Sequence, residues 1–269
     1  MKDYLKEITE KAADSRIAGL LIREYFQARI LEIIQESGGF ETWAFLGGTA
    51  LRFIYSIPRF SEDLDFSLSS GGEKDNFTVI LKKVEKSFSV EGYRLIIKPD
   101  EERTVKSALF KFQGILHEIG LSHHQSEILS IKVEIDTNPP AGAVLETSLV
   151  RKHRILNLLH YDRGSLLAGK LYALLACNYV KGRDVYDLFW YLADRTWPEP
   201  NLELLNNSLA QTGWKGERIT SSNWKSLIME KLSGYNWNEI VRDVRPFLED
   251  QKQVDMLTRD NLIKLLKSI

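Results

Sequence analysis

The sequence contains a single cysteine, Cys177, among 269 residues. One thiol excludes an internal disulfide and a zinc site built from several cysteines. Long apolar runs are also missing, and one of the longest, residues 171–177, is far too short to cross a membrane. The first residues are charged throughout and lack the apolar core of a signal peptide. These absences predict a globular, cytoplasmic protein with no membrane association.

An excess of charge of either sign is absent as well. The chain carries 36 basic and 37 acidic side chains, a net charge of −1, and so has no overall attraction for nucleic acid. Binding to RNA would depend on a local patch, for which residues 151–154 (Arg-Lys-His-Arg) are a candidate, helped by Arg163 and Lys170. The simpler interpretation, which composition favours, is a solvated basic turn.

The first half of the chain alternates between helical and extended patterns. Apolar residues at helical spacing predict one helix over residues 4–36. A short apolar strand over 42–46 follows, then a turn at Gly47–Gly48 and a helix that Thr49 caps and that runs to about residue 55. The remaining elements predicted here are strands at 64–68, 93–98, 105–112 and 128–136, and a helix at 75–88.

The second half of the chain reads as helical. Helices are predicted at 165–178, 183–194, 201–210, 222–233, 236–248 and 257–268. We therefore expect an α+β fold, in which a mixed sheet flanked by helices precedes a helical C-terminal half. The expected domains are residues 1–140, with N-terminal helices and the α/β core, and residues 141–269, a helical domain.

Two aspartates form the most informative local pattern. Asp63 and Asp65 are one residue apart in or beside a predicted strand, so their side chains project from the same face. They follow a strand–Gly-Gly–helix unit, which presents backbone amides to an anion. Paired carboxylates just after a phosphate-binding turn predict a site for magnesium and a nucleoside triphosphate (NTP).

A third carboxylate is expected, because phosphoryl-transfer sites with two metals share ligands between ions about 4 Å apart. In the strand at 128–136, alternation puts Lys132, Glu134 and Asp136 on one face and apolar residues on the other. Glu134, in mid-strand, is the first choice and Asp136 the second. Lys132 would neutralise excess negative charge or contact a triphosphate. The alternative is that this charged face is merely solvated.

These segments resemble a known family. Residues 47–52 and 59–66 resemble motif I of the AbiEii/AbiGii toxins, a group of DNA polymerase β-like nucleotidyltransferases that includes the MenT-type toxins. Residues 132–135 resemble its second motif. Lys170, followed by residues 183–188, resembles its third and fourth, and the motifs occur in the family's order.

The resemblance implies a polymerase β-like core and roles for individual residues. It implies that Asp63 and Asp65 hold magnesium, with two ions expected, and that Glu134 ligates one ion and acts as general base. Asp184 or Asp187 would orient a lysine or the base. The residues that would bind the nucleotide are Gly47, Gly48, Thr49, Arg52, Ser61, Lys132 and Lys170.

Asp184 and Asp187 have an alternative explanation. They are i, i+3 neighbours on a predicted helix, and acidic residues in a first helical turn stabilise the helix dipole by about 0.3–1 kcal/mol. Without the family likeness this capping role is about as good an interpretation as a catalytic one. With the likeness, a role in the site is favoured.

The leading functional hypothesis is a magnesium-dependent nucleotidyltransferase that moves a nucleoside monophosphate from an NTP to a hydroxyl. The resemblance supplies the acceptor, the 3′ end of tRNA, and the toxin role. One alternative is transfer to a protein, to a small molecule or to the enzyme's own Ser61. Another is a non-catalytic nucleotide-binding protein that acts through a partner such as a cognate antitoxin.

Overall fold

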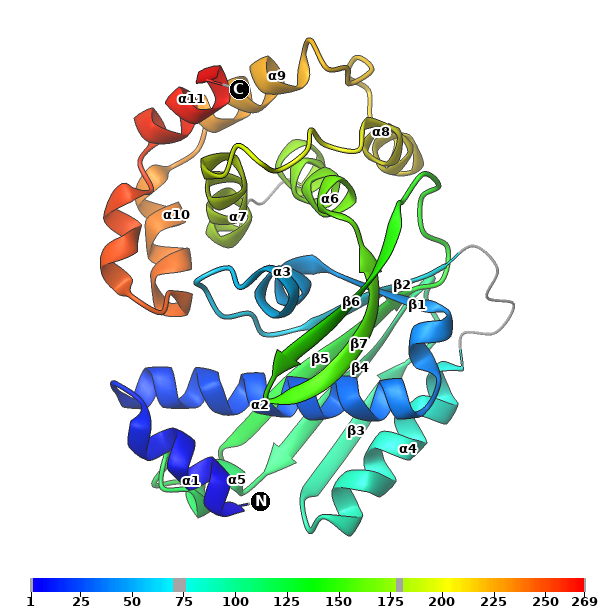
Figure 1. Ribbon diagram of the computed structural model, residues 1–269, viewed down its shortest axis with the longest axis vertical. Coiled ribbons are helices and arrows are strands. Elements are labelled where there is room, and N and C mark those ends of the chain that lie inside the picture. Colours follow the sequence, from blue (N-terminus) through cyan, green and yellow to red (C-terminus); the bar gives the residue numbers. More distant parts are fainter. Residues whose placement is uncertain (1, 70–75, 178–180, 269) are drawn as a thin grey trace. The chain divides into compact units, whose positions relative to one another are not determined.

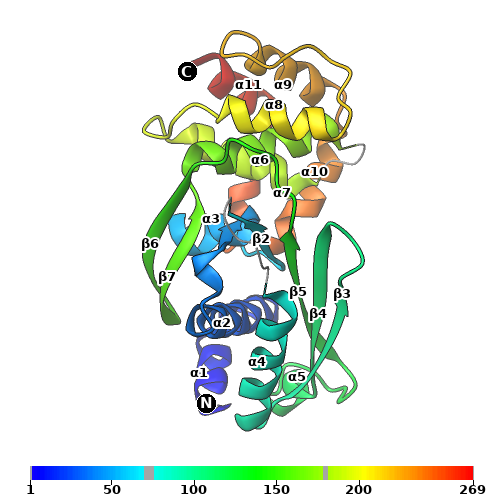
Figure 2. The same ribbon diagram turned by 90° about the vertical axis from the view of Figure 1, so that its right-hand side faces the viewer.

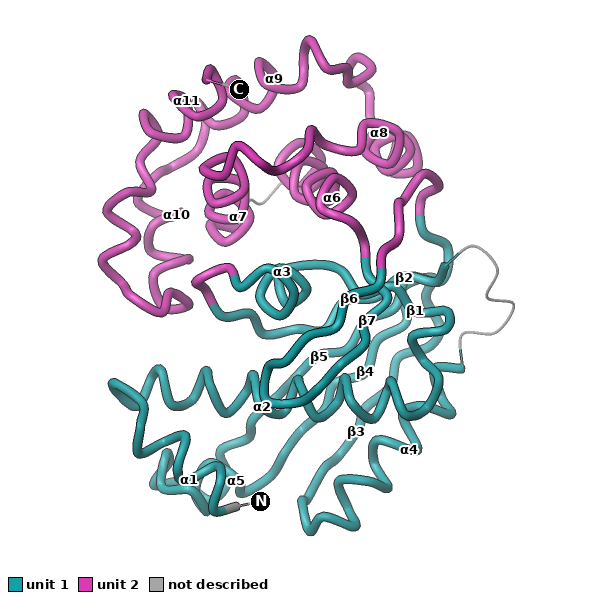
Figure 3. The backbone as a smooth tube through the Cα atoms, viewed as in Figure 1, with its two compact units in different colours: residues 1–56, 60–139, 147–160 teal, residues 57–59, 140–146, 161–269 magenta. Residues whose placement is uncertain are grey.

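The computed structural model describes residues 2–69, 76–177 and 181–268. The chain divides into two compact units (Figure 3). Unit 1 comprises residues 1–56, 60–139 and 147–160, and unit 2 comprises residues 57–59, 140–146 and 161–269. The domain boundary expected at residue 140 stays a prediction. Residues 147–160 belong to unit 1, together with the N-terminal part of the chain.

Unit 1 contains a seven-stranded mixed sheet with the strand order β3-β4-β5-β2-β1-β7-β6 (Figures 1 and 2). β2 and β5 run parallel, whereas β2 and β1 are antiparallel. The five strands predicted from sequence are present. The strands are β1 (Trp43–Leu46), β2 (Leu64–Leu68), β3 (Arg94–Asp100), β4 (Val105–Gln113), β5 (Ile128–Asp136), β6 (Leu145–Lys152) and β7 (Arg154–Tyr161).

Strands β6 and β7 were not expected from the sequence pattern. β6 forms one edge of the sheet, and its apolar residues do not alternate with polar ones: Val150 is buried, but the neighbouring Leu149, also apolar, is 64% exposed. An edge strand packs on fewer neighbours, so alternation of apolar and polar side chains stabilises it less than it stabilises a central strand. The period-2 signal is therefore weak in this part of the chain.

The helices of unit 1 correct one prediction. The single helix expected over 4–36 is two helices, because Asp14 caps the second by accepting a hydrogen bond of 2.7 Å from the backbone N–H of Ile17. The second helix has buried residues on all sides, as expected for a core helix. The helices are α1 (Lys2–Lys11), α2 (Ser15–Glu36), α3 (Gly47–Tyr55), α4 (Phe77–Val90) and α5 (Ile115–Glu118), with a 3-10 turn at Gly39–Glu41.

Aromatic packing joins these helices to the sheet. The rings of Phe26 on α2 and Phe112 on β4 lie 4.3 Å apart between centroids, and Phe88 on α4 lies 5.0 Å from Phe112. Offset or edge-on pairs of this kind add about 0.5–1.5 kcal/mol each beyond the area they bury. Residue 75, where the sequence placed the start of α4, lies outside the described residues.

Unit 2 is helical, as predicted, and the six helices expected from sequence are present with shifts of a few residues at their ends. α10 ends early at Val244, where a 3-10 turn containing Pro246 takes over. Residue 178, the predicted end of α6, lies outside the described residues. The helices are α6 (Arg163–Ala176), α7 (Gly182–Ala193), α8 (Leu202–Gln211), α9 (Trp224–Ser233), α10 (Trp237–Val244) and α11 (Arg259–Ser268).

The fold class is confirmed: a mixed sheet flanked by helices precedes a helical C-terminal half. Within the described parts of the chain, no helix combines the length and apolarity needed to cross a bilayer.

Candidate active site

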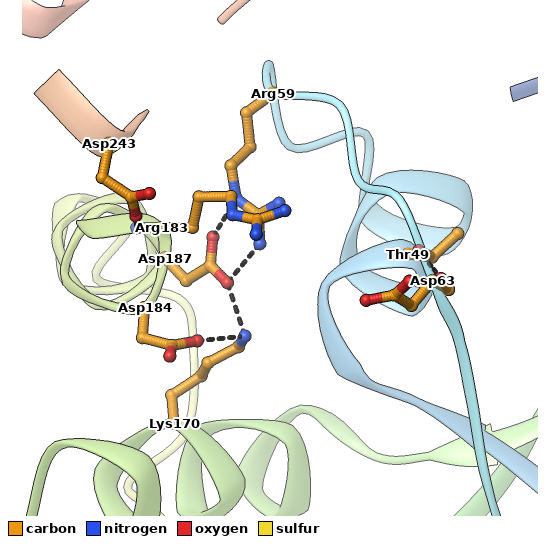
Figure 4. Close-up of polar contacts among 8 residues, drawn as sticks. All are labelled: Thr49, Arg59, Asp63, Lys170, Arg183, Asp184, Asp187 and Asp243. Atoms are coloured by element: carbon orange, nitrogen blue, oxygen red, sulfur yellow. Dashed lines mark hydrogen bonds and ion pairs between the residues drawn. The ribbon is translucent and has the colours of Figure 1, made fainter. Parts of the chain in front are cut away.

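The bend between β1 and α3 requires glycine at its first position. Gly47 has a φ of +79°, and a methyl group at this position would collide with the carboxylate of Asp65. The prediction that Thr49 caps α3 is wrong, because the helix begins two residues earlier. Thr49 is instead fully buried, and its hydroxyl donates a hydrogen bond to the backbone carbonyl of Asp63 (Figure 4). The bend is thus linked to both aspartates.

Sheet pairing places the expected carboxylates close together. Asp65 on β2 lies opposite Glu134 on the parallel strand β5, and opposite Leu46 on β1, directly before the bend. Residues that pair across neighbouring strands project from the same face of a sheet. The predicted alternation on β5 is present, since its apolar residues Ile131, Val133 and Ile135 are buried while the charged ones between them are half-buried.

A lysine lies among these carboxylates. The ammonium of Lys132 is 2.7 Å from Oε1 of Glu134. The pKa of Lys132 is raised, chiefly because of its hydrogen bond to Glu134 and further because of the negative charges of Asp63 and Asp65. Three carboxylates therefore act on one cation: Asp65 and Glu134 on neighbouring strands, and Asp63 just before β2.

Asp136, the second choice for the third carboxylate, has a different partner. Its Oδ1 accepts a hydrogen bond of 2.9 Å from the backbone N–H of Asn138, and in register it faces Ser67. This contact stabilises the turn that follows β5. Glu134, which lies opposite Asp65, is the better-placed candidate.

Helix α2 fixes the loop that leads to the aspartates. Gln27, which is buried, donates a hydrogen bond of 3.1 Å to the carbonyl of Ser61, and Arg23 lies 3.2 Å from the carboxylate of Glu62. Arg52, expected at the nucleotide, is buried on α3 with its Nε 2.6 Å from Glu24. Its guanidinium therefore packs inside unit 1 as a support for α3.

Unit 2 brings the remaining predicted residues together. The ammonium of Lys170 on α6 lies 2.8 Å from Oδ1 of Asp184 and 2.7 Å from Oδ2 of Asp187, both on α7 (Figure 4). Asp187 also receives two hydrogen bonds of 2.5 Å from Nε and Nη2 of Arg59. We refer to these four residues as the buried charge cluster.

Burial and charge act in opposite directions on this cluster. Burial alone would lower the pKa of Lys170, but the negative charges of Asp184 and Asp187 outweigh it and raise that pKa. Burial alone would raise the pKa of Asp187, but Arg59 and Lys170 outweigh it and keep that pKa below its usual value. Lys170 and Asp187 are therefore both charged at neutral pH.

Arg59 is the member of the cluster to which the sequence analysis gave no role. It stands at the start of the Arg-x-Ser-Glu-Asp-x-Asp motif, four residues before Asp63. Its side chain is 2% exposed, and that of Asp187, its partner 128 residues away, is fully buried. Its place in the same motif as Asp63 and Asp65 was the available sign of a role for Arg59, but nothing local in the sequence indicated its partner.

The basic run at 151–154 is a turn, but it is not simply solvated. Lys152 and His153 both contact the buried Glu24, at 3.4 and 3.1 Å. Arg154 lies 3.4 Å from Glu32 and donates a 3.2 Å hydrogen bond to the hydroxyl of Tyr25. Most of this charge is thus paired within unit 1, which weakens the case for an RNA-binding patch here.

The residues of unit 1 suit magnesium in their chemistry. Oxygen ligands from carboxylates are what Mg²⁺ prefers, and Asp63, Asp65 and Glu134 provide them. Across the described residues, no three carboxylate, histidine or cysteine side chains already converge as a metal-binding group. The cation now beside Glu134 is the ammonium of Lys132, so a metal would have to compete with it.

Comparison with known proteins agrees with this geometry. The family described as "Nucleotidyl transferase AbiEii toxin, Type IV TA system" matches residues 29–259. Two solved structures from Helicobacter pylori share the fold. One, described as a candidate nucleotidyltransferase, has a TM-score of 0.53 and 18% identity, with 92% of each chain covered. The other, JHP933, has a TM-score of 0.51 and 17% identity, with 93% of this chain and 92% of that chain covered. No curated protein matches the chain.

Proposed function

This chain belongs to the AbiEii family of nucleotidyltransferase toxins, and from that premise we propose that it transfers a nucleoside monophosphate from an NTP to RNA. The proposed acceptor is the 3′-terminal hydroxyl of tRNA, and the proposed metal is Mg²⁺. The family's assignment to type IV toxin–antitoxin systems also points to an antitoxin as the functional counterpart.

The observation that carries the proposal is the pairing of Asp65 with Glu134 beside the bend at Gly47. Asp63 is added to this pair through its backbone, which the buried hydroxyl of Thr49 holds. Carboxylates on a merely solvated sheet face would not require a glycine bend against Asp65 or a buried threonine hydroxyl bonded to the backbone of Asp63.

Each predicted site residue has a role in the proposal. Asp63, Asp65 and Glu134 would hold magnesium, which when bound offsets charge on the phosphates. Glu134 is also the proposed general base for the acceptor hydroxyl. The amides of Gly47 and Gly48 would face the triphosphate. Thr49 and Arg52 support these elements from within the unit, and Ser61 lies in the loop beside them.

Lys170 is a further proposed phosphate contact, as the family resemblance implies. A lysine kept cationic by buried carboxylates is a suitable partner for an anionic triphosphate, and Asp184 and Asp187 orient its ammonium.

A labelled-nucleotide assay tests the proposal. The enzyme is incubated with each labelled NTP, Mg²⁺ and total tRNA, and label is measured separately on RNA and on protein. We expect label on RNA, lost on addition of a chelator. Label on protein alone would indicate a protein acceptor such as Ser61, and bound but unconsumed NTP would indicate a non-catalytic binder.

Variants identify the metal-binding carboxylates in the same assay. Asp63→Ala should lower transfer by about a thousandfold or more, because several kcal/mol of charge stabilisation would be lost with the metal. Its melting temperature should stay near that of the wild type, because the Asp63 side chain is half-buried at the surface. Asp136→Asn is the matched control on the same sheet face and should keep most of the activity. Near-normal transfer by Asp63→Ala would contradict the assignment.

A further inference from the structure

Asp187 is shared by two cations inside unit 2. Its Oδ2 lies 2.7 Å from the ammonium of Lys170 and 2.5 Å from Nη2 of Arg59, and its Oδ1 accepts from Nε of Arg59 at 2.5 Å (Figure 4). The side chain of Asp187 is 0% exposed and that of Arg59 is 2% exposed. Water therefore contributes little to neutralising this carboxylate, and its two protein partners must do so.

The formal charge of the cluster depends on Arg59. Lys170 faces two carboxylates, and these three groups alone would carry a net charge of −1. The guanidinium of Arg59 brings the four directly bonded groups to zero. Like charges repel strongly where water is excluded, so a cluster at −1 would repel an anionic ligand more strongly than a neutral cluster would.

The backbone around Arg59 is held in place by contacts within unit 2. Residues 57–59 belong to unit 2, where the backbone of Arg59 forms a bridge with Leu248 and the N–H of Glu249 donates to the carbonyl of Pro58 at 3.2 Å. Two parallel hydrogen bonds from one planar guanidinium to one carboxylate are a geometry that lysine cannot reproduce.

We propose that Arg59 is a positioning residue for nucleotide binding: by neutralising Asp187, it leaves the positive charge of Lys170 available to the phosphates of the NTP. This inference rests on the proposed function, in which Lys170 contacts those phosphates. Asp187 then orients Lys170 without cancelling its charge, while Asp184 holds the other side of the ammonium.

The test measures binding of each NTP, free of acceptor, by calorimetry, alongside melting temperatures. Arg59→Met keeps much of the side-chain volume and removes the charge, and should weaken NTP binding by about tenfold or more. Arg59→Met combined with Asp187→Asn removes the uncompensated carboxylate as well, returns the cluster to neutrality, and should restore affinity to within about threefold of wild type. Arg59→Lys should restore affinity only in part.

Arg29→Met is the matched control, because Arg29 is also largely buried and paired with two carboxylates, Glu32 and Glu91, but lies in unit 1. It should lower the melting temperature and leave NTP affinity unchanged. If Arg59→Met folds too poorly to measure, the double variant still decides: wild-type-like binding supports the proposal, and weak binding by a folded double variant overturns it.

The remaining outcomes separate this inference from the proposed function. Wild-type protein that binds none of the four NTPs would overturn both. Wild-type protein that binds an NTP, with Arg59→Met binding it equally well, would overturn only the role of Arg59.

Discussion

At the scale of single residues, Lys132 links the charges of the candidate metal site. Its ammonium lies 2.7 Å from Glu134, and the charges of Asp63 and Asp65 help raise its pKa. Carboxylates that lie near one another repel unless a cation is present. Lys132 supplies that cation in the protein alone. A metal bound by the same oxygens would displace it, and the released ammonium could then contact a triphosphate.

Removing this lysine should therefore strengthen metal binding. Lys132→Met is expected to raise the affinity for Mg²⁺, measured by calorimetry without nucleotide, by about threefold to tenfold, since one competing cation at close range is lost. Lys111→Met, on the neighbouring strand β4, is the control for a loss of net charge and should leave this affinity unchanged. Unchanged or weaker Mg²⁺ binding by Lys132→Met would show that the lysine does not compete with the metal.

At the scale of elements, the bend between β1 and α3 and the strand β2 depend on each other. Gly47 begins α3 with a positive φ, and its missing side chain leaves the space that the carboxylate of Asp65 occupies. Thr49, one half-turn further on, holds the backbone of Asp63. The helix thus sets the position of both aspartates, although it has no side-chain cap of its own.

Gly47→Ala tests this dependence. We expect it to destabilise the protein by more than the about 1–2 kcal/mol that a left-handed backbone costs an alanine, because a collision with Asp65 is added. Gly92→Ala is the matched control: Gly92 has a φ of +81° and open space around it, so it measures the backbone cost alone. Nucleotide transfer should fall sharply in Gly47→Ala and persist in Gly92→Ala. Equal stability losses and equal activities in the two variants would contradict the proposed contact.

At the scale of the whole molecule, the buried charge cluster contributes to stability through residues far apart in the chain. Arg59 and Asp187 are separated by 128 positions, and their ion pair holds the segment 57–59 within unit 2. Removing one partner of a buried ion pair leaves the other charge buried and uncompensated, which costs about 3–5 kcal/mol.

The stability that Asp187 contributes should depend on pH in one direction. The pKa of this carboxyl is lower in the folded protein than its ordinary value of 3.8, because Arg59 and Lys170 outweigh its burial. Its contribution is therefore complete above about pH 4 and is lost as the pH falls through the lowered pKa. In chemical denaturation, the difference in unfolding free energy between wild type and Asp187→Asn should shrink as the pH is lowered below 4. A difference that stays constant over this pH range would contradict the expected pH dependence.

Local sequence patterns indicated most of the elements and the candidate residues of the proposed metal site. Alternation along residues 131–136 indicated which face of β5 carries Glu134, and the two glycines that begin α3 marked the bend, because both signals come from neighbours in the chain. Helical spacing in the second half of the chain predicted helices α6 to α11, with shifts of a few residues at their ends. The break at Asp14 and the strands β6 and β7 were not predicted. A cap inside a long apolar pattern leaves a weak periodic signal, and so does the edge strand β6.

Which charged groups pair with one another depends on the tertiary structure alone. It paired Asp65 with Glu134 across two strands, turned Arg52 inward to Glu24, and joined Arg59 to Asp187. The physical reason is that a buried charge must be neutralised by whatever lies beside it in space, and that neighbour can come from anywhere in the chain. The family resemblance suggested Lys170 and either Asp184 or Asp187 as site residues, but the identity of the cation that balances Asp187 was set by folding alone.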